Sequence, residues 1–224
     1  MCYDLRTSLL FYMVGMISAI FAIYTGFSNN NSGQLILGFL VLTYVQVQLG
    51  EAIIWRGIDT NSINLNKTGT DYLKYTLSMH IIGIAIGVLI SVIIIEKRGL
   101  KIKDFIPLMI GVIVSMSVIN FFYNSIDSTY PQNGKSDSEC RNNDNRLEWK
   151  FSDNWWWYGI SALISMSILV LYSSSMKSKF FIPFMFTITL VLSTMFFPKN
   201  IGSMWCFLSA ITAPVIVLGN YFMM

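Results

Sequence analysis

The chain has 224 residues, of which 54% are hydrophobic and only 12% are charged, and its formal net charge is +3. A soluble domain carries about twice that fraction of charged residues, so the composition indicates an integral membrane protein whose main partner is the lipid bilayer. The basic residues are scattered over short segments without interleaved aromatic side chains, which argues against any role in nucleic-acid binding.

Apolar segments of about 20 residues, the length of a helix that crosses a bilayer, follow one another along the chain. They lie at 8–27, 34–55, 76–95, 104–123, 155–175, 178–197 and 201–222. We therefore predict an all-α, polytopic membrane protein: a seven-transmembrane-helix bundle, rhodopsin-like in shape, with one transmembrane domain over residues 1–224. Residues 56–75 and 124–154 are predicted to be connections outside the membrane, and 124–154 is rich in Asn, Asp and Ser, as an irregular loop is.

Successive spans alternate in direction, so their ends define two faces, which we call face A (the face of the N-terminus) and face B. The short connections at face B are rich in basic residues, namely Lys97, Arg98, Lys101, Lys103, Lys177 and Lys179. Short basic loops are retained on the cytoplasmic side of a membrane. The sequence therefore predicts an N-terminus that is outside or lumenal and a C-terminus that is cytosolic.

All six tryptophans are predicted to lie at face A: Trp55, Trp149, Trp155, Trp156, Trp157 and Trp205. Tryptophan normally marks both interfaces of a membrane. A one-sided distribution indicates that face A holds an aromatic-walled cavity in addition to lipid contacts. The alternative is a belt that steadies the helices at the interface.

The segment 34–55 contains the strongest candidate for a binding site. Tyr44, Gln48, Glu51 and Trp55 are spaced so that they share one stripe of a helix. Glu51 is the only charged residue clearly inside an apolar segment, and an acid there is expected to face the bundle interior or a wet cavity. Two interpretations stay open: Glu51 binds a cation, a proton or a polar ligand, or it belongs to a structural hydrogen-bond network.

Other candidates are predicted to surround Glu51. His80, the only histidine, is expected one turn inside the third segment from face A, at the depth of Glu51. The remaining members of the predicted ring are Asn120, Trp156, Trp157 and Trp205. Aromatic rings together with a carboxylate can hold a cation, so the ring predicts a site for a small molecule or an ion.

Polar residues in several spans would extend this site into a path toward face B. They are Thr43, Gln46, Ser91, Ser165, Ser167, Ser209 and Thr212. A continuous path would favour transport over binding alone. Pro214 in the last segment is expected to kink or loosen its helix.

Two further features concern packing and cross-links. Gly83 and Gly87 form a G-x-x-x-G pattern, which predicts close helix packing within the chain or, alternatively, a seam for a homo-oligomer. Cys2, Cys140 and Cys206 are all predicted at face A, where they form a disulfide or remain free thiols.

Several functions are not supported by the residues present. One histidine and scattered thiols do not make a zinc site, and neither G-x-S-x-G nor a P-loop occurs. The last segment has no lysine for a retinal Schiff base, and no span carries the arginine ladder of a voltage sensor. We therefore predict neither an enzyme nor a bound metal or cofactor.

Three short motifs carry a resemblance. The start Met1-Cys2-Tyr3, the run Gln48-Leu-Gly-Glu51-Ala-Ile-Ile-Trp55-Arg56 and the pair Trp205-Cys206 resemble an uncharacterised group of seven-span proteins found in large DNA viruses of protists and in some microbes. Such proteins tend to begin Met-Cys-Trp, from which Tyr3 departs. The resemblance implies a host or virion membrane. It also implies that Cys2, Gln48, Glu51, Trp55, Trp205 and Cys206 belong together at face A.

These observations predict a bundle that binds or transports a small molecule or ion through a polar and aromatic cavity open to face A, with Glu51 as its anchor. The alternative is a receptor-like or scaffold protein in which the loop 124–154 binds a partner and the polar ring is structural.

Overall fold

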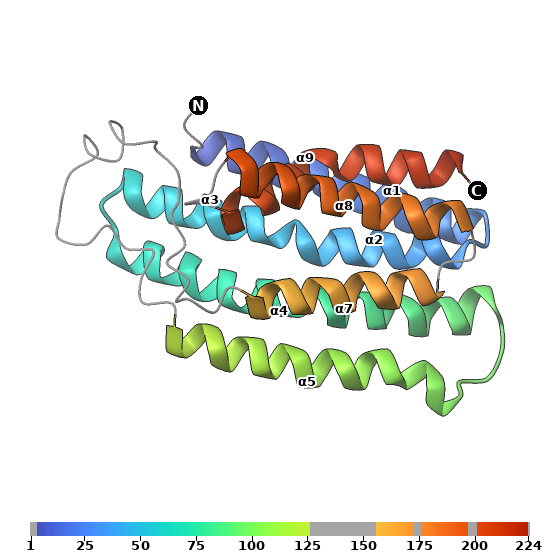
Figure 1. Cartoon of the computed structure of the whole chain (residues 1–224). Coiled ribbons are helices and arrows are strands. Elements are labelled where there is room, and N and C mark those ends of the chain that lie inside the picture. The colour runs from blue at the N-terminus through green and yellow to red at the C-terminus, as the bar shows by residue number, and fades with distance from the viewer. Residues whose placement is uncertain (1–3, 126–155, 173–175, 197–200, 224) are drawn as a thin grey trace.

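A computed structural model describes residues 4–125, 156–172, 176–196 and 201–223, and each regular element in these ranges is a helix. The helices are α1 (Leu5–Ser28), α2 (Ser32–Tyr44), α3 (Gln46–Asp59), α4 (Ile63–Ile90) with a π-helical end η1 (Ser91–Ile95), α5 (Ile102–Ser125), α7 (Trp156–Tyr172), α8 (Met176–Phe196) and α9 (Ile201–Phe222). Helices α2 and α3 form one rod, and so do α4 and η1. The rods run side by side in alternating directions (Figure 1). Face A is the end where α1 begins.

Five of these rods are long and apolar enough to cross a membrane: Leu5–Ser28, Ser32–Asp59, Ile63–Ile95, Ile102–Asn120 and Lys179–Phe196. The described parts of α7 and α9 contain shorter apolar stretches, Leu163–Tyr172 and Leu208–Phe222. The predicted all-α bundle is thus confirmed, and its helices are compatible with an integral, multi-pass membrane protein. Seven membrane crossings stay a prediction.

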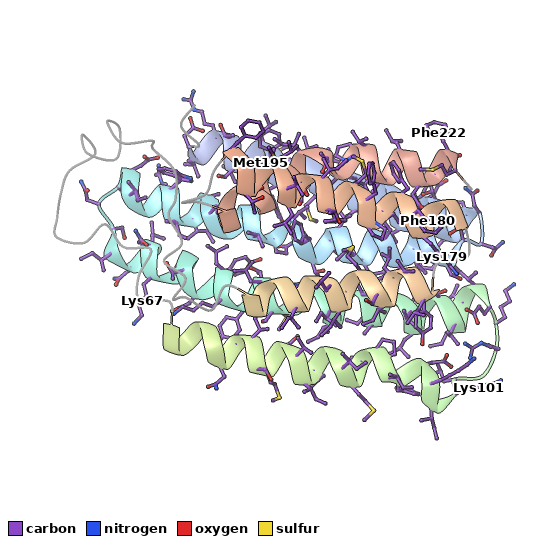
Figure 2. All side chains as sticks on the ribbon, viewed as in Figure 1. Lys67, Lys101, Lys179, Phe180, Met195 and Phe222 are labelled. Carbon is purple, nitrogen blue, oxygen red and sulfur yellow. The ribbon has the colours of Figure 1, made fainter. Side chains whose placement is uncertain are left out.

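The surface of the bundle is apolar and much of its interior is polar. Large hydrophobic side chains project outward from α1, α5, α8 and α9, among them Ile17, Met116, Phe180, Met195 and Phe222 (the last three labelled in Figure 2). Buried side chains include many amides, hydroxyls and acids. Exposing such an apolar surface to water is unfavourable, whereas exposing it to the hydrocarbon of a bilayer is not.

Helices α2 and α4 form the centre of the bundle. Helix α4 packs against α2, α3, α5 and α7, whereas α1 covers α2 and α3 and also contacts α9. The apolar core between these helices is built from fully buried aliphatic side chains, among them Leu37, Leu40, Ile54, Leu77, Ile81 and Ile84. The polar side chains that remain inside are therefore held by rigid, well-packed elements.

The connection expected over 56–75 is helical instead. Helix α3 continues to Asp59 and α4 already begins at Ile63, so only Thr60–Ser62 join them. The turn uses a left-handed conformation at Asn61, with a φ of 51°. The third rod therefore begins 13 residues earlier than the predicted start at Thr76, and it extends the α3–α4 hairpin toward face A.

Close helix packing explains why a segment rich in Asn, Thr and Gly is helical here. A Cβ added to Gly57 would lie 2.6 Å from the backbone nitrogen of Asn66, and one added to Gly69 would lie 2.9 Å from that of Ile54. Only glycine lets the two backbones approach so closely. The packing of α3 on α4 outweighs the weak helix propensity of the segment.

The second rod is one apolar span over Ser32–Asp59, as predicted, with a local change of hydrogen bonding at Val45 that the sequence did not predict. The Val45 N–H donates to the Val41 carbonyl (2.9 Å), but the Gln48 N–H donates to the Val45 carbonyl only three residues back (3.0 Å). The Gln46 side chain binds across this position: its Nε2 donates to the Leu42 carbonyl (3.0 Å), and its Oε1 accepts the Tyr72 hydroxyl of α4 (2.8 Å). This part of the rod is thereby tied to α4.

Gly83 and Gly87 belong to the packing of α4 on α2. A Cβ on Gly83 would lie 2.5 Å from Thr43 Cγ2, and a Cβ on Gly87 would lie 3.1 Å from Ile36 Cα. Both glycines are buried. The intramolecular interpretation of the G-x-x-x-G pattern therefore describes this structure, and an oligomer seam through these glycines would require α2 to leave α4.

The connection at face B is fixed by ion pairs of Arg98. Its guanidinium donates two hydrogen bonds to the buried Asp104 carboxylate (2.6 and 2.8 Å) and one to Glu96 (2.6 Å). Asp104 also accepts the Lys101 N–H (2.7 Å). The bonds with Asp104, and then those with Glu96, raise the pKa of Arg98 above its ordinary value. Arg98 therefore stays charged and closes the turn between η1 and α5.

Candidate functional site at face A

The predicted stripe on the second rod is buried throughout. The exposed fraction is 8% for Tyr44, 1% for Gln48, 5% for Glu51 and 8% for Trp55. The Tyr44 ring meets the Phe186 ring of α8 edge-on, with centroids 5.9 Å apart, and α3 also packs against α9. The stripe therefore faces the bundle interior.

Gln48 is the least satisfied member of this stripe, and Glu51 has no described ion pair. The ion pairs within the described ranges are Lys74–Asp71, Arg98–Glu96 and Arg98–Asp104, so none of them neutralises Glu51. The Gln48 side chain lies one turn away, near the Glu51 carboxyl. Neither amide atom of Gln48 finds a partner at hydrogen-bonding geometry in the described part of the chain. A buried polar group left without a partner destabilises a fold by about 1–3 kcal/mol.

His80 lies deeper in the bundle than the sequence predicted. Along the α3–α4 hairpin, Gly50 contacts Leu73 and Tyr72, which puts Tyr72 at the level of Glu51. His80 is eight residues farther along α4, which is about 12 Å at 1.5 Å per residue. The prediction that Glu51 and His80 share one depth is therefore wrong. His80 lies deeper because α4 begins earlier than predicted, at Ile63. His80 is buried there among the central helices.

Helix α4 supplies polar side chains that the sequence reasoning missed. Lys74 is buried, with its side chain 10% exposed, and its ammonium lies 3.6 Å from Asp71, whose side chain is 38% exposed. Thr70 and Asn66 are also buried, and Asn66 Oδ1 has no hydrogen-bond partner in the described ranges. The missed signal was a polar stripe at positions 66, 70 and 74, since these positions were assigned to a loop.

The two helices direct these side chains to the same side of the hairpin. Helices α3 and α4 run antiparallel and meet through Gly50 and Gly69. Residues that directly follow such contact positions turn to the same side of an antiparallel pair. Glu51 and Thr70 are those residues, and Lys74 lies one turn beyond Thr70.

We call Gln48, Glu51, Asn66, Thr70 and Lys74 the face A polar cluster. Glu51 and Lys74 differ in depth by only two residues along the hairpin register, which is about 3 Å. The cluster thus holds an acid, a base and two buried amides on one side of the hairpin, spread over about 12 Å of depth from Asn66 to Lys74.

Of the remaining predicted members of the ring, one is exposed, and the side chains of the others lie outside the described residues. Asn120 is exposed on α5 rather than buried. Trp156 and Trp157 open α7, and Trp205 lies in the first turns of α9, both at face A, but their side chains lie outside the described part of the structure. The same holds for Trp149, Trp155, Cys2, Cys140 and the Cys206 side chain. The aromatic cavity and the disulfide stay predictions.

The residues predicted to extend the site toward face B form several separate hydrogen bonds in the described part of the chain. Ser167 is exposed and donates to the Leu163 carbonyl (2.8 Å), and Thr43 and Thr212 likewise donate to carbonyls of their own helices. Ser209 meets Thr189 of α8 at 3.2 Å. Ser91 and Ser165 are buried. These described hydrogen bonds lie within single helices or join α8 to α9, and a transport path stays a prediction.

Within the described ranges, no group of three or more His, Cys, Asp or Glu side chains is placed to hold a metal ion. The fold and the cluster together define a class: an all-helical bundle compatible with an integral, multi-pass membrane protein, with a polar cluster buried at face A. No protein-family model, curated protein or solved structure matches the chain.

Proposed function

We propose that this chain is a seven-span membrane protein that binds a small cation or an amine-bearing solute at the face A polar cluster. The observation that carries the proposal is the buried Glu51 carboxyl beside a Gln48 amide that has no hydrogen-bond partner in the described ranges. An acid inside a membrane bundle needs a proton, a cation or a partner of opposite charge. A bound cation or ammonium group would neutralise Glu51 and could also bind Gln48 Oε1.

A second glutamine in the same rod supports a ligand over a structural network. Gln34 is as deeply buried as Gln48, but its Nε2 donates to Thr25 Oγ1 and to the Val217 carbonyl, both at 3.3 Å. Its Oε1 accepts the Asn220 amide. This is how a structural glutamine is satisfied in this bundle. Gln48 lacks such bonds in the described ranges, as expected for a side chain whose partner is a ligand.

Transport stays the finer form of this proposal. The local change of hydrogen bonding at Val45 lies one turn from Gln48, but the rod continues through it over Ser32–Asp59, so it favours neither transport nor binding alone. The competing proposal is a receptor-like or scaffold protein whose segment 124–154 binds a partner, and it draws on the length of that segment alone.

The resemblance to seven-span proteins of large DNA viruses agrees with this site, since Gln48, Glu51 and Trp55 are among the residues that carry it. Membership of that group, and with it a host or virion membrane, remains part of the proposal. It attaches no activity to the chain.

The test is ligand-dependent thermal stabilisation of the purified protein in lipid nanodiscs. The probes are sodium, potassium, methylammonium and butylammonium chloride. We expect at least one of them to raise the melting temperature of the natural protein, and Glu51→Gln to abolish that rise without lowering the folded yield. Asp59→Asn is the matched control, since Asp59 is an exposed acid at the end of the same helix. An equal rise in the Glu51→Gln protein would contradict the proposal.

A further inference from the structure

The turn between η1 and α5 lies where the surface of a bilayer would meet the bundle. The two apolar spans that it joins end at Ile95 and begin at Ile102, so residues 96–101 fall between them at face B. The turn is also fixed to a third helix, because the Tyr172 hydroxyl of α7 donates to the Lys103 carbonyl (3.2 Å). A bilayer around these spans would therefore have its phosphate groups beside a well-defined segment of the chain.

Three lysines of this segment are available to a partner. Lys97, Lys101 and Lys103 are exposed, and the ion pairs of the described ranges do not include them. Both acids of the segment are hydrogen-bonded to Arg98 instead, one of them by two bonds. The segment 96–104 contains four bases and two acids, which leaves a net charge of +2. Arg98 thus binds the acids that could otherwise pair with the lysines.

Large apolar side chains project from the same segment as the lysines. Leu100, Ile102, Phe105 and Ile106 are exposed, and Ile102, the first residue of α5, is 86% exposed. Such exposure is unfavourable in water but not at the boundary of the acyl chains. Lysines interspersed with protruding apolar groups are typical of a segment that lies in the interface of an anionic membrane, with its ammonium groups at the level of the phosphates.

From this arrangement we infer that the η1–α5 turn is a binding surface for anionic phospholipids in the leaflet at face B. Lys97, Lys101 and Lys103 bind the phosphate groups, and the apolar side chains beside them contact the acyl chains. Lys179, which begins the span of α8, lies at the same end of the bundle as Lys101 (both labelled in Figure 2). The inference is independent of the face A polar cluster and of any ligand bound there.

The charge of the lipid should decide which phospholipid binds. A zwitterionic phospholipid carries its own ammonium group beside the phosphate, so the lysines gain little from it, whereas an anionic headgroup meets the positive charge without such a competitor. Anionic phospholipids give the cytoplasmic leaflet its negative surface potential. Binding at face B therefore agrees with the orientation that the basic loops predict.

Native mass spectrometry of the purified natural protein tests this inference. The protein is offered phosphatidylglycerol and phosphatidylcholine with the same acyl chains at equal concentration, and the bound lipids are identified by mass. We expect a preference for phosphatidylglycerol of at least about fivefold, the effect of roughly one lysine near an anionic surface. The preference should weaken as the ammonium acetate concentration rises, because salt screens exposed charges. Glycerol phosphate, which has the phosphate without acyl chains, should not displace the lipid at equal concentration.

A combined variant assigns the preference to the turn. Lys97→Gln, Lys101→Gln and Lys103→Gln together should bring the ratio of the two bound lipids close to that of the mixture offered. Replacing the same three lysines by arginine keeps the charge and should keep the preference. The matched control removes three exposed bases from face A and should also keep it: Arg6→Gln, Arg56→Gln and Lys67→Gln.

Three results would overturn the inference. The first is equal binding of the two lipids by the natural protein. The second is a loss of preference in the face A variant as large as in the face B variant, since the effect would then reflect net charge alone. The third is displacement of the lipid by glycerol phosphate, which would make the surface a site for soluble phosphate. If the glutamine variant does not fold, the natural protein still decides, because a preference that salt leaves unchanged would also contradict binding by exposed lysines.

Discussion

Gln34 and Gln48 lie on the same rod and are equally buried, but they differ in the hydrogen bonds of their side chains. Gln34 connects three helices, because it is bonded to Thr25 of α1 and to Val217 and Asn220 of α9. Gln48 has no such bonds in the described ranges. Burial does not distinguish them, whereas their hydrogen-bond partners give Gln34 a structural role and support the proposed site at Gln48.

This difference predicts opposite effects of leucine. Gln34→Leu leaves the Asn220 amide and the Val217 carbonyl without their present partner, so it should destabilise the bundle by about 1–3 kcal/mol. Gln48→Leu removes an amide with no partner in the described ranges, so the ligand-free protein should melt at the same or a higher temperature. Thermal unfolding of both proteins in one lipid measures this. A loss in Gln48→Leu as large as that in Gln34→Leu would assign Gln48 a structural role.

At the scale of elements, the α3–α4 hairpin determines where the site lies. Its register puts Lys74 of α4 within about 3 Å of Glu51 in depth, and it puts Asn66 opposite Gly57, nearer to face A. This register depends on glycines, because side chains at the contact would separate the two backbones.

We therefore expect Gly57→Ala to be strongly destabilising. The added methyl group would lie 2.6 Å from the backbone nitrogen of Asn66, and backbone atoms cannot move aside as a flexible side chain does. Gly99→Ala is the control, since nothing lies within 4 Å of a Cβ at that position. Melting temperatures of the two variants should differ clearly. Equal values would show that the close contact between α3 and α4 does not exist in the membrane.

The apolar segments predicted most elements well and the hairpin badly. Helix α9 begins at the predicted residue, and α1, α5 and α8 begin within a few residues of theirs, because their sequences are continuously apolar. The residues 56–75 are polar and glycine-rich, and only tertiary packing makes most of them helical. The local change of hydrogen bonding at Val45 has no marker such as proline in the sequence.

The candidate site was predictable to the extent that it lies on one helix. The spacing of Tyr44, Gln48, Glu51 and Trp55 predicts their shared stripe, and all four are buried. The contribution of α4 was not predictable, because the start of that helix fixes the depth of Lys74 and of His80, and the sequence placed the start too late.

At the scale of the whole molecule, the two faces differ in charge. Lys97, Lys101 and Lys103 are exposed at face B, while the polar cluster lies at face A. Basic segments stay on the cytoplasmic side, so face A is expected to open to the outside or to a lumen.

Reporter tags at both ends of the chain test this topology. With seven spans we expect an accessible N-terminal tag outside the membrane and a C-terminal tag in the cytosol. Two tags on the same side would contradict seven spans. Tags on the reverse sides would contradict the orientation and leave the number of spans intact.

The proposed site depends most on one property: the buried carboxyl of Glu51 binds a ligand in the interior of the bundle. Dicyclohexylcarbodiimide, which is apolar and reacts with protonated carboxyl groups, measures this directly when the labelled residue is identified by peptide mass spectrometry. We predict modification of Glu51 in membranes, and its suppression by the cation or amine that raises the melting temperature. Absence of modification at Glu51, or modification that no binding probe suppresses, would contradict the account.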